Sequence, residues 1–276
     1  MRVGTARGSG RRVPVVVRDG GLYELAGDGR DLRELIAAGR EAIEAAAEQA
    51  AGPLAGAELA APLRPGKIVA IGLNYLDHIR EQGGERPERP LVFAKFPSCV
   101  IGPGEPIPID HEVSRKVDWE VELAVVVGEE ISRASPEEAI ERVFGYTVAN
   151  DVTARDLQRS DGQWVRAKSL DGFCPLGPSI VSADELGDPQ ALALKTTVNG
   201  EAMQDSSTAQ MLFGVAELLS FCSRSFRLEP GDVLLTGTPW GVGAYMDPRR
   251  FLEPGDEVEV SVERIGRLRN PVVAAG

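Results

Sequence analysis

Short apolar runs separated by glycine, proline and polar residues make up most of the chain. This pattern is typical of β-strands joined by loops, and it predicts a β-rich protein. Near the N-terminus, two apolar runs flank Asp19-Gly20-Gly21 within residues 13–25, which predicts a β-hairpin. Further strands are predicted at residues 67–75, 91–97, 117–128, 144–152, 174–181, 194–201, 231–239 and 256–266.

Three segments have the pattern of helices. Residues 31–52 are rich in alanine and place their leucines and isoleucines on one side, which predicts one helix. Shorter helices are predicted at 135–143, where a serine precedes acidic residues, and at 211–225.

Prolines mark a boundary early in the chain. Pro53, Pro62 and Pro65 separate the first hairpin and helix from the strand-rich remainder. We therefore expect an α+β, β-rich fold with a small N-terminal α/β domain at residues 1–62 and a larger domain at residues 63–276. The many irregular connections in the larger domain are the usual carriers of functional residues.

The predicted strand at 117–128, VDWEVELAVVVG, has an unusual distribution of charge. Its apolar side carries Trp119, Val121, Leu123, Val125 and Val127. The opposite side begins with three acids and continues with two apolar residues, in the order Asp118, Glu120, Glu122, Ala124 and Val126. From spacing alone, a solvent-exposed edge is the favoured interpretation of such an acidic face.

A third carboxylate suggests a metal site instead. Asp151 ends the predicted strand at 144–152, and Glu120 and Glu122 emerge on one face of theirs. Adjacent carboxylates repel each other unless a cation lies between them. Three hard oxygen ligands suit Mg²⁺, Mn²⁺ or Ca²⁺ rather than zinc.

Acid–base chemistry has two further candidates. His78 and Glu81 lie three residues apart, so one helical turn would place both on the same side and form a general acid/base pair. Lys168 lies in an apolar setting and could hold a negatively charged substrate or intermediate. Taken singly, a surface histidine and a solvated lysine remain the commoner explanations.

Composition excludes several classes of protein. The 276-residue chain is 43% hydrophobic and 26% charged, an ordinary globular balance, and its net charge of −12 disfavours nucleic-acid and membrane partners. Three widely spaced cysteines indicate free thiols in a reducing compartment. No apolar segment follows the basic start and no run approaches the ~18 residues of a membrane span, so we expect a cytoplasmic protein.

Six motifs in order resemble the fumarylacetoacetate hydrolase family. They are KIVAIGLNYLDHIRE, DWEVELAVVVG, GYTVANDVTARDLQ, AKSLDGFCPLGP, VNGE and GDVLLTGTPWGVG, and they run from about Pro65 to about Val262. The resemblance implies a mixed β-roll of the type found in the family's C-terminal domain, and a homodimer. It implies Mg²⁺ or Mn²⁺ bound by Glu120, Glu122 and Asp151.

The resemblance also assigns roles around that metal. It implies that His78, Glu81 and Lys168 are catalytic, with the histidine and glutamate on a segment that forms a lid. It implies that the substrate contacts the remaining matched positions, Arg155, Gln158 and Thr238.

Several reactions are compatible with such a site. Our first expectation is C–C bond hydrolysis of a 2-oxo acid or acylpyruvate through a metal-stabilised enolate. The alternatives are an isomerase or decarboxylase, of the oxaloacetate or 5-oxopent-3-ene-1,2,5-tricarboxylate type, and a hydratase or lyase of aromatic catabolism. An alternative of another class is a non-catalytic binding protein that uses the same fold.

Overall fold

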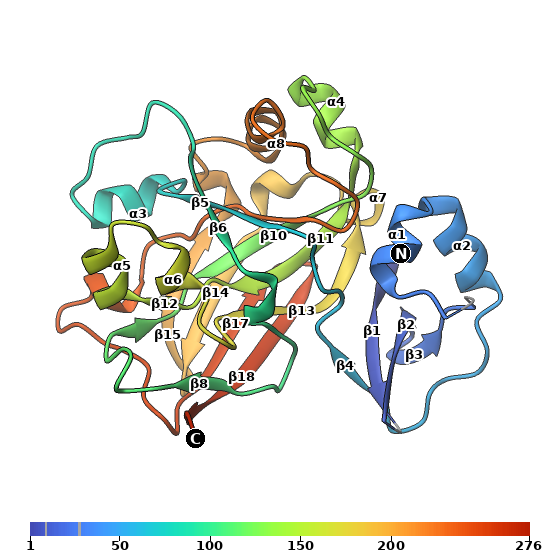
Figure 1. Ribbon diagram of the computed structural model, residues 1–276, viewed down its shortest axis with the longest axis horizontal. Coiled ribbons are helices and arrows are strands. Elements are labelled where there is room, and N and C mark those ends of the chain that lie inside the picture. Colours follow the sequence, from blue (N-terminus) through green and yellow to red (C-terminus); the bar gives the residue numbers. More distant parts are fainter. Residues whose placement is uncertain (9, 27–28) are drawn as a thin grey trace.

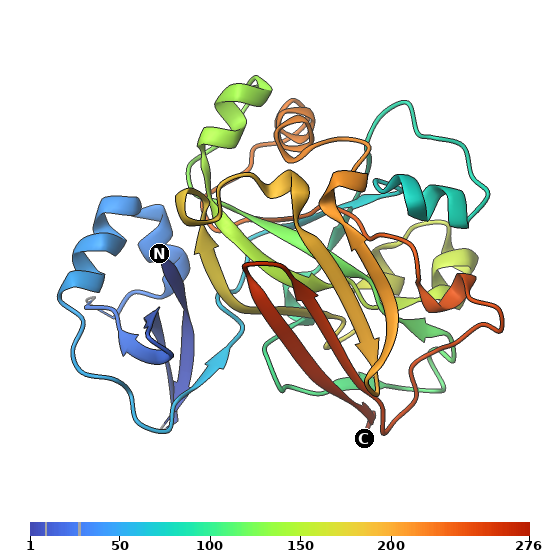
Figure 2. The ribbon, with the colours of Figure 1, turned by 180° about the vertical axis from the view of Figure 1, so that it is seen from behind.

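A large mixed sheet forms the centre of the protein (Figure 1, Figure 2). The computed structural model describes residues 1–8, 10–26 and 29–276. Within these residues the sheet has eleven strands, in the order β3-β2-β1-β13-β11-β10-β16-β5-β6, with β4 paired to β1 and β7 to β13. The strands are Arg2–Gly8 (β1), Arg11–Arg18 (β2), Gly21–Glu24 (β3), Glu58–Ala60 (β4), Ile68–Gly72 (β5), Leu91–Lys95 (β6), Val100–Ile101 (β7), Val121–Val127 (β10), Val143–Asn150 (β11), Cys174–Ser182 (β13) and Val233–Leu235 (β16).

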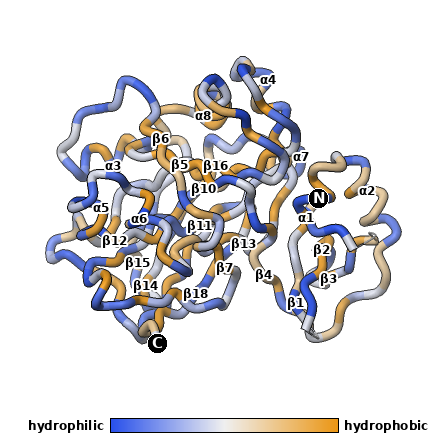
Figure 3. The backbone as a smooth tube through the Cα atoms, viewed as in Figure 1, coloured by the Kyte–Doolittle hydropathy of each residue, from blue (hydrophilic) through white to orange (hydrophobic). Residues whose placement is uncertain are grey.

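A second sheet shares the main hydrophobic core with the first. Over the described residues it has five strands, in the order β15-β14-β17-β18-β8. They are Ile107–Ile109 (β8), Ala193–Val198 (β14), Glu201–Ser207 (β15), Glu257–Val262 (β17) and Gly266–Ala274 (β18). A two-stranded ladder is formed by Val117–Asp118 (β9) and Thr153–Ala154 (β12). Hydrophobic residues gather in the central strands, whereas many outer loops are hydrophilic (Figure 3). The described residues form mixed sheets with short helices, so the predicted β-rich α+β fold is confirmed.

Short helices cover the sheets and carry several loops. They are Leu32–Ala37 (α1), Arg40–Glu48 (α2), Leu76–Glu81 (α3), Pro136–Glu141 (α4), Arg155–Asp161 (α5), Val165–Lys168 (α6), Ala183–Leu186 (α7) and Val215–Ser223 (α8). Single 3₁₀ turns are Pro97–Cys99 (η1), Pro189–Ala191 (η2), Thr208–Gln210 (η3) and Gly243–Tyr245 (η4). The predicted helices at 135–143 and 211–225 contain α4 and α8.

The prediction of one helix over 31–52 is wrong, because the segment forms two. Gly39 has φ +95°, a left-handed conformation that ends α1 and turns the chain into α2. The hairpin prediction at 13–25 is confirmed by β2 and β3. Asp19 and Gly20 have φ +49° and +75°, which is the geometry of a tight two-residue hairpin turn.

Strand β10 is central in the large sheet, between β11 and β16. Every one of its residues is buried, so the exposed-edge interpretation of its acidic face is wrong. Val121, Leu123 and Val125 belong to the core shared with the second sheet. Ala124 and Val126, on the other face, belong to the core that includes the N-terminal helices. The strand is therefore apolar on both faces because it separates two cores.

The N-terminal strands continue the large sheet. Strand β1 pairs antiparallel with β13, where Arg2 lies opposite Val181. Two ion pairs lie next to this contact: Arg40 is 2.7 Å from Asp184 at the exposed surface, and the partly buried Met1 amino group is 2.5 Å from Glu185. The division into domains at residue 62 stays a prediction.

Candidate active site

Three buried carboxylates meet where β10 begins and β11 ends. Glu122 lies on β10, Glu120 immediately precedes it, and Asp151 immediately follows β11. The antiparallel register places Val121 opposite Asn150, and the Asp151 N–H donates to the Glu120 carbonyl at 2.8 Å. One oxygen from each carboxylate lies within 4.8 Å of the others. The structure thus brings together the three residues predicted as metal ligands.

Two buried lysines contact this carboxylate cluster. Lys168 Nζ lies 2.6 Å from Glu120 Oε2 and 2.6 Å from Asp151 Oδ2, so it bridges them. Lys95 Nζ lies 2.5 Å from Asp151 Oδ1 and donates to the Phe173 carbonyl at 3.0 Å. Lys168 was predicted from the sequence, whereas Lys95 was not.

Arg155 is the third buried cation, and carboxylates occupy much of its guanidinium group. It donates to Asp118 at 2.7 Å, to Glu120 at 2.5 Å and to Gln158 Oε1 at 3.1 Å. The Ala244 N–H donates to the other Asp118 oxygen at 2.9 Å. Asp118 therefore supports Arg155 from outside the cluster of three. Arg155 and Gln158 both line the cavity, and their predicted contact with substrate stays a prediction.

The pKa values reflect crowded negative charge. Burial raises the pKa of Glu122 well above its ordinary value, and the charges of Asp151 and Glu120 raise it further. Burial would also raise the pKa of Glu120, but the charges of Lys168 and Arg155 outweigh it and lower that pKa to about 2. Glu122 is thus the carboxylate that the neighbouring cations compensate least.

The donor set fits a hard divalent cation. Four buried carboxylates, those of Asp118, Glu120, Glu122 and Asp151, face three buried cations, those of Lys95, Arg155 and Lys168. The excess charge is negative and lies near Glu122, whose Oε2 accepts from the Gly237 N–H at 2.7 Å. Carboxylate oxygens are the ligands that Mg²⁺ and Mn²⁺ prefer. Glu120, Glu122 and Asp151 are the residues that would hold such an ion.

The predicted acid–base pair lies on α3. His78 Nδ1 is 2.9 Å from Glu81 Oε2, and the other Glu81 oxygen accepts from the Gly241 N–H at 2.9 Å. A carboxylate at Nδ1 assigns the proton to that nitrogen and leaves a lone pair on Nε2. The Gln82 side-chain amide lies 2.6 Å from Nε2, and its oxygen accepts from Tyr245 at 3.2 Å. Contacts at both ring nitrogens therefore fix the orientation of the His78 ring.

Thr238 closes the cluster from the loop after β16. Its hydroxyl donates to the Val121 carbonyl at 3.0 Å and accepts from the Gln204 amide at 2.9 Å. Gly237, with φ +94°, turns its N–H toward Glu122. A side chain at Gly237 would come within 3.1 Å of the Ile71 carbonyl, so the loop requires glycine there.

Part of this network lines one small cavity of about 210 Å³. Glu120, Glu122 and Lys168 form its charged inner end. Phe93 and Trp164 form an aromatic wall, with ring centroids 5.2 Å apart. Five of the predicted catalytic and substrate-binding residues line this cavity, namely His78, Arg155, Gln158, Lys168 and Thr238. Glu81 and Asp151 are not part of its wall, and the roles of all these residues stay predictions.

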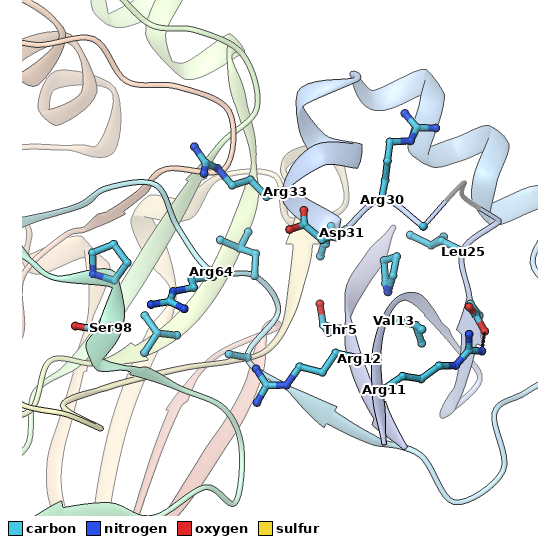
Figure 4. Close-up of a pocket in the computed structure, with 18 residues that line it drawn as sticks. Thr5, Arg11, Arg12, Val13, Leu25, Arg30, Asp31, Arg33, Arg64 and Ser98 are labelled. Carbon is cyan, nitrogen blue, oxygen red and sulfur yellow. Dashed lines mark hydrogen bonds and ion pairs between the residues drawn. The ribbon is translucent and has the colours of Figure 1, made fainter. Parts of the chain in front are cut away.

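A larger cavity of about 600 Å³ lies elsewhere, between the N-terminal strands and residues 61–64 and 97–100 (Figure 4). Several arginines line it, but Arg11 pairs with Glu24 at 2.7 Å and Arg12 pairs with Glu105 at 3.1 Å. Neither the carboxylate cluster nor His78 lies in its wall. We therefore place the chemistry in the smaller cavity.

Sequence reasoning missed five residues of the site: Lys95, Gln82, Phe93, Tyr245 and Arg159. Lys95 ends a short apolar strand and carries no local signal for burial. The glutamine, the two aromatic residues and the arginine reach the cavity from separate segments. Residues four apart on a helix face the same side. The interval between Arg155 and Arg159 was therefore the one indication in the sequence that Arg159 lies near the site.

Comparison with known proteins agrees with this geometry. The model of the fumarylacetoacetate hydrolase C-terminal family matches residues 67–273. The chain is 46% identical to a mitochondrial oxaloacetate tautomerase of Xenopus laevis over 218 residues, which are 78% of this chain and 68% of that protein. The chain belongs to the fumarylacetoacetate hydrolase family.

Solved structures of the family share the whole fold. A fumarylacetoacetate hydrolase from psychrophilic Exiguobacterium antarcticum superposes with a TM-score of 0.90 at 40% identity, over 100% of both chains. A 5-carboxymethyl-2-hydroxymuconate delta-isomerase from Mycobacterium smegmatis superposes with a TM-score of 0.82 at 37% identity, again over 100% of both chains. The predicted β-roll of this family is therefore confirmed.

Two findings bear on the location of the protein in the cell. Across the described residues, none of the helices has the length and apolar character needed to span a bilayer. Relatives with mitochondrial names exist, so a cytoplasmic location stays a prediction.

Proposed function

We propose that this protein is a divalent-metal-dependent enzyme that interconverts keto and enol forms of 2-oxo acids. The observation that carries the proposal is that His78, oriented by Glu81, lines the same small cavity as Glu120, Glu122 and Lys168. A proton acceptor and a charge-stabilising cluster are the two parts that enolisation requires.

Each side chain has a definite part in that reaction. Enolisation removes a proton from the carbon beside the carbonyl while the carbonyl oxygen gains negative charge. A divalent cation held by the carboxylate cluster would supply positive charge to that oxygen. Once the substrate displaces the Gln82 amide, which lies 2.6 Å from His78 Nε2, this nitrogen takes the proton from carbon and returns it to the enolate oxygen. Glu81 at Nδ1 stabilises the imidazolium between the two transfers. Lys168 bridges Glu120 and Asp151 at the inner end of the cavity and so holds two of the three proposed metal ligands in position.

A solved structure named as a fumarylacetoacetate hydrolase agrees with our first expectation, C–C hydrolysis. The names of other relatives favour proton transfer instead. They include oxaloacetate tautomerase and 5-carboxymethyl-2-hydroxymuconate delta-isomerase. Moving a proton within one molecule needs a single base, whereas hydrolysis also needs a positioned water.

A second candidate function is nevertheless hydrolysis of acylpyruvates, because the same His78–Glu81 pair could deprotonate a water molecule. Mg²⁺ and Mn²⁺ both remain candidates for the metal, and the homodimer stays a prediction.

The direct test follows the decay of enol-oxaloacetate in the ultraviolet, with Mg²⁺, with Mn²⁺ and with a chelator. We expect acceleration by the metal-loaded enzyme and its loss on chelation. His78→Asn should lower the rate by about 10²–10⁴-fold, the usual contribution of a general base. The matched control is His111→Asn, because His111 is the chain's other histidine and pairs with exposed Glu253 at 3.2 Å.

Two outcomes would contradict the proposal. One is a wild-type enzyme that binds metal but leaves enol-oxaloacetate at its spontaneous rate. The other is His78→Asn with full tautomerase activity. If the wild-type enzyme instead cleaves acetopyruvate in a His78-dependent way and does not tautomerise oxaloacetate, the second candidate function is correct.

A further inference from the structure

The outer end of the active-site cavity carries a cation without a partner. Arg159 lines the cavity and is exposed. Within the described part of the chain, its guanidinium group makes no ion pair or side-chain hydrogen bond. The acids that line the cavity are Glu120 and Glu122, and both belong to the inner cluster. A positive charge at a cavity mouth without a protein acid beside it is available to a ligand.

The other cations of the cavity are already engaged. Arg155 donates to two carboxylates, and Lys168 bridges two. Arg159 follows Arg155 by four residues on α5, so both lie on the same side of the helix. One helical turn separates the two positions by about 6 Å along the axis. The inner end of the cavity therefore holds cations that are engaged by carboxylates, whereas the outer end holds a cation, Arg159, without such a partner among the described residues.

Nonpolar side chains line the cavity between these ends. Phe93 and Trp164 make an edge-to-face pair, and Leu73 lines the same cavity. Gly72 makes room for this wall, because a Cβ there would lie 2.5 Å from the Trp164 ring. Leu73 has φ +54°, a strained conformation for leucine that tends to occur at functional sites. The cavity thus accepts a short carbon skeleton between two charged ends.

We propose that Arg159 binds a second carboxylate of the substrate and makes the enzyme selective for short-chain 2-oxo dicarboxylic acids. The 2-oxo acid group occupies the inner end, the carbon chain lies along Phe93 and Trp164, and the distal carboxylate reaches Arg159. A guanidinium group suits this role because its N–H donors match a carboxylate in pairs. The cavity of about 210 Å³ restricts the ligand to small acids. This inference rests on the proposed function of the same cavity.

The binding role predicts a particular kinetic signature. Arg159 lies at the mouth and takes no part in proton transfer, so its loss should raise KM and leave kcat nearly unchanged. A charge-assisted hydrogen bond lost at a partly solvated site corresponds to about a tenfold change. The effect should weaken as salt is added, because exposed charges are screened.

The experiment compares two substrates that differ in the distal group. Oxaloacetate has a second carboxylate, and 2-oxobutanoate has a methyl group in its place. Enolisation of both is followed by hydrogen–deuterium exchange at C3, detected by NMR, in the presence of Mg²⁺. The variants are Arg159→Gln and Arg159→Lys, and the matched control is Arg224→Gln, an exposed arginine after α8 outside the cavity.

We expect Arg159→Gln to raise KM for oxaloacetate about tenfold and to leave 2-oxobutanoate exchange unchanged. Arg159→Lys should recover part of the loss, and Arg224→Gln should behave as wild type. Equal effects of Arg159→Gln on both acids, or no effect on either, would overturn the inference while leaving the proposed function intact. A wild-type enzyme that exchanges neither acid would overturn the proposed function, and the inference with it.

Discussion

Two networks of ion pairs in this protein use the same chemical groups in opposite environments. At the active site, carboxylates and cations are almost completely buried, as Asp151 and Lys95 show with side chains 0% exposed. Between helices α2 and α7, the ion pair of Arg40 and Asp184 is open to water, with side chains 47% and 52% exposed. The first network surrounds the candidate metal site, and the second is a weak surface connection.

Solvation explains the difference. Buried charges have lost their hydration, so each must be compensated by a neighbour, and any excess charge attracts an ion strongly. The excess of carboxylates over cations around Glu122 therefore makes this cluster the candidate cation site. In an exposed pair, the contact between the two charges replaces contacts that each charge makes with water. Such a pair therefore contributes only about 0–1 kcal/mol to the free energy of unfolding.

The largest expected effect comes from breaking the buried network at Arg155. Arg155→Met would leave Asp118 and Glu120 buried without their common partner. We expect the free energy of unfolding to fall by about 3–5 kcal/mol, measured by urea denaturation. Arg155→Lys should restore little, because Arg155 reaches Asp118 through Nε and Glu120 through Nη2, and lysine has no second donor at a separate position on its side chain. A loss below 1 kcal/mol would show that burial does not distinguish the two networks.

A second test removes the excess charge itself. Glu122→Gln leaves three buried carboxylates opposite three cations, so the attraction for a divalent ion should disappear. We expect Mn²⁺ affinity to fall by at least about 100-fold in calorimetric titration, since even residues behind the ligands change affinity 10–100-fold. The control Glu201→Gln changes a carboxylate that is 71% exposed and should leave Mn²⁺ binding unchanged. Retained Mn²⁺ affinity in Glu122→Gln would contradict the assignment of this ligand.

The exposed network should respond much less. Arg40→Ala removes the contact to Asp184 and a second one to Glu44 at 2.7 Å. We expect unfolding free energy to fall by about 0.2–1 kcal/mol in low salt and by less in 1 M NaCl. Urea denaturation at both salt concentrations measures this. A larger loss that persists in high salt would mean that this contact is as strongly coupled as the buried one.

The smallest expected effect is a change in thermal stability at low pH. The hydrogen bond from Arg40 lowers the pKa of Asp184 below its ordinary value. A carboxyl whose folded pKa is lowered contributes stability that is present above its unfolded pKa, about 3.9, and is lost as pH falls further. The difference in Tm between wild type and Arg40→Ala should therefore be equal at pH 7 and pH 5 and should shrink below about pH 4. A difference that already changes between pH 7 and pH 5 would implicate another group.

Particular residues show how far sequence reasoning reached. Alternation along residues 117–128 identified Glu120 and Glu122 on one face, and the spacing of His78 and Glu81 identified their contact, since both are local properties of the backbone. The prediction that this acidic face is exposed was wrong. Alternation along a strand shows which residues share a face, but it does not show what packs against that face.

Other features depend on contacts between distant segments. Lys95 meets Asp151 across 56 positions of sequence, and the Gly237 N–H meets Glu122 across 115. The position of Arg159 at the cavity mouth likewise depends on how α5 packs near Phe93 and Trp164. No local pattern encodes these distances.

The sequence by itself determined which side chains could carry the chemistry, because strand and helix periods fix the direction of each side chain along its own element. Only the tertiary structure decided that these side chains act together. Pairing of β10 with β11 and β16 removed the carboxylates from water, and packing of the loops supplied the lysines and the arginine that balance most of their charge. Solvation and long-range packing, which no short segment controls, turned an acidic strand into a candidate cation site.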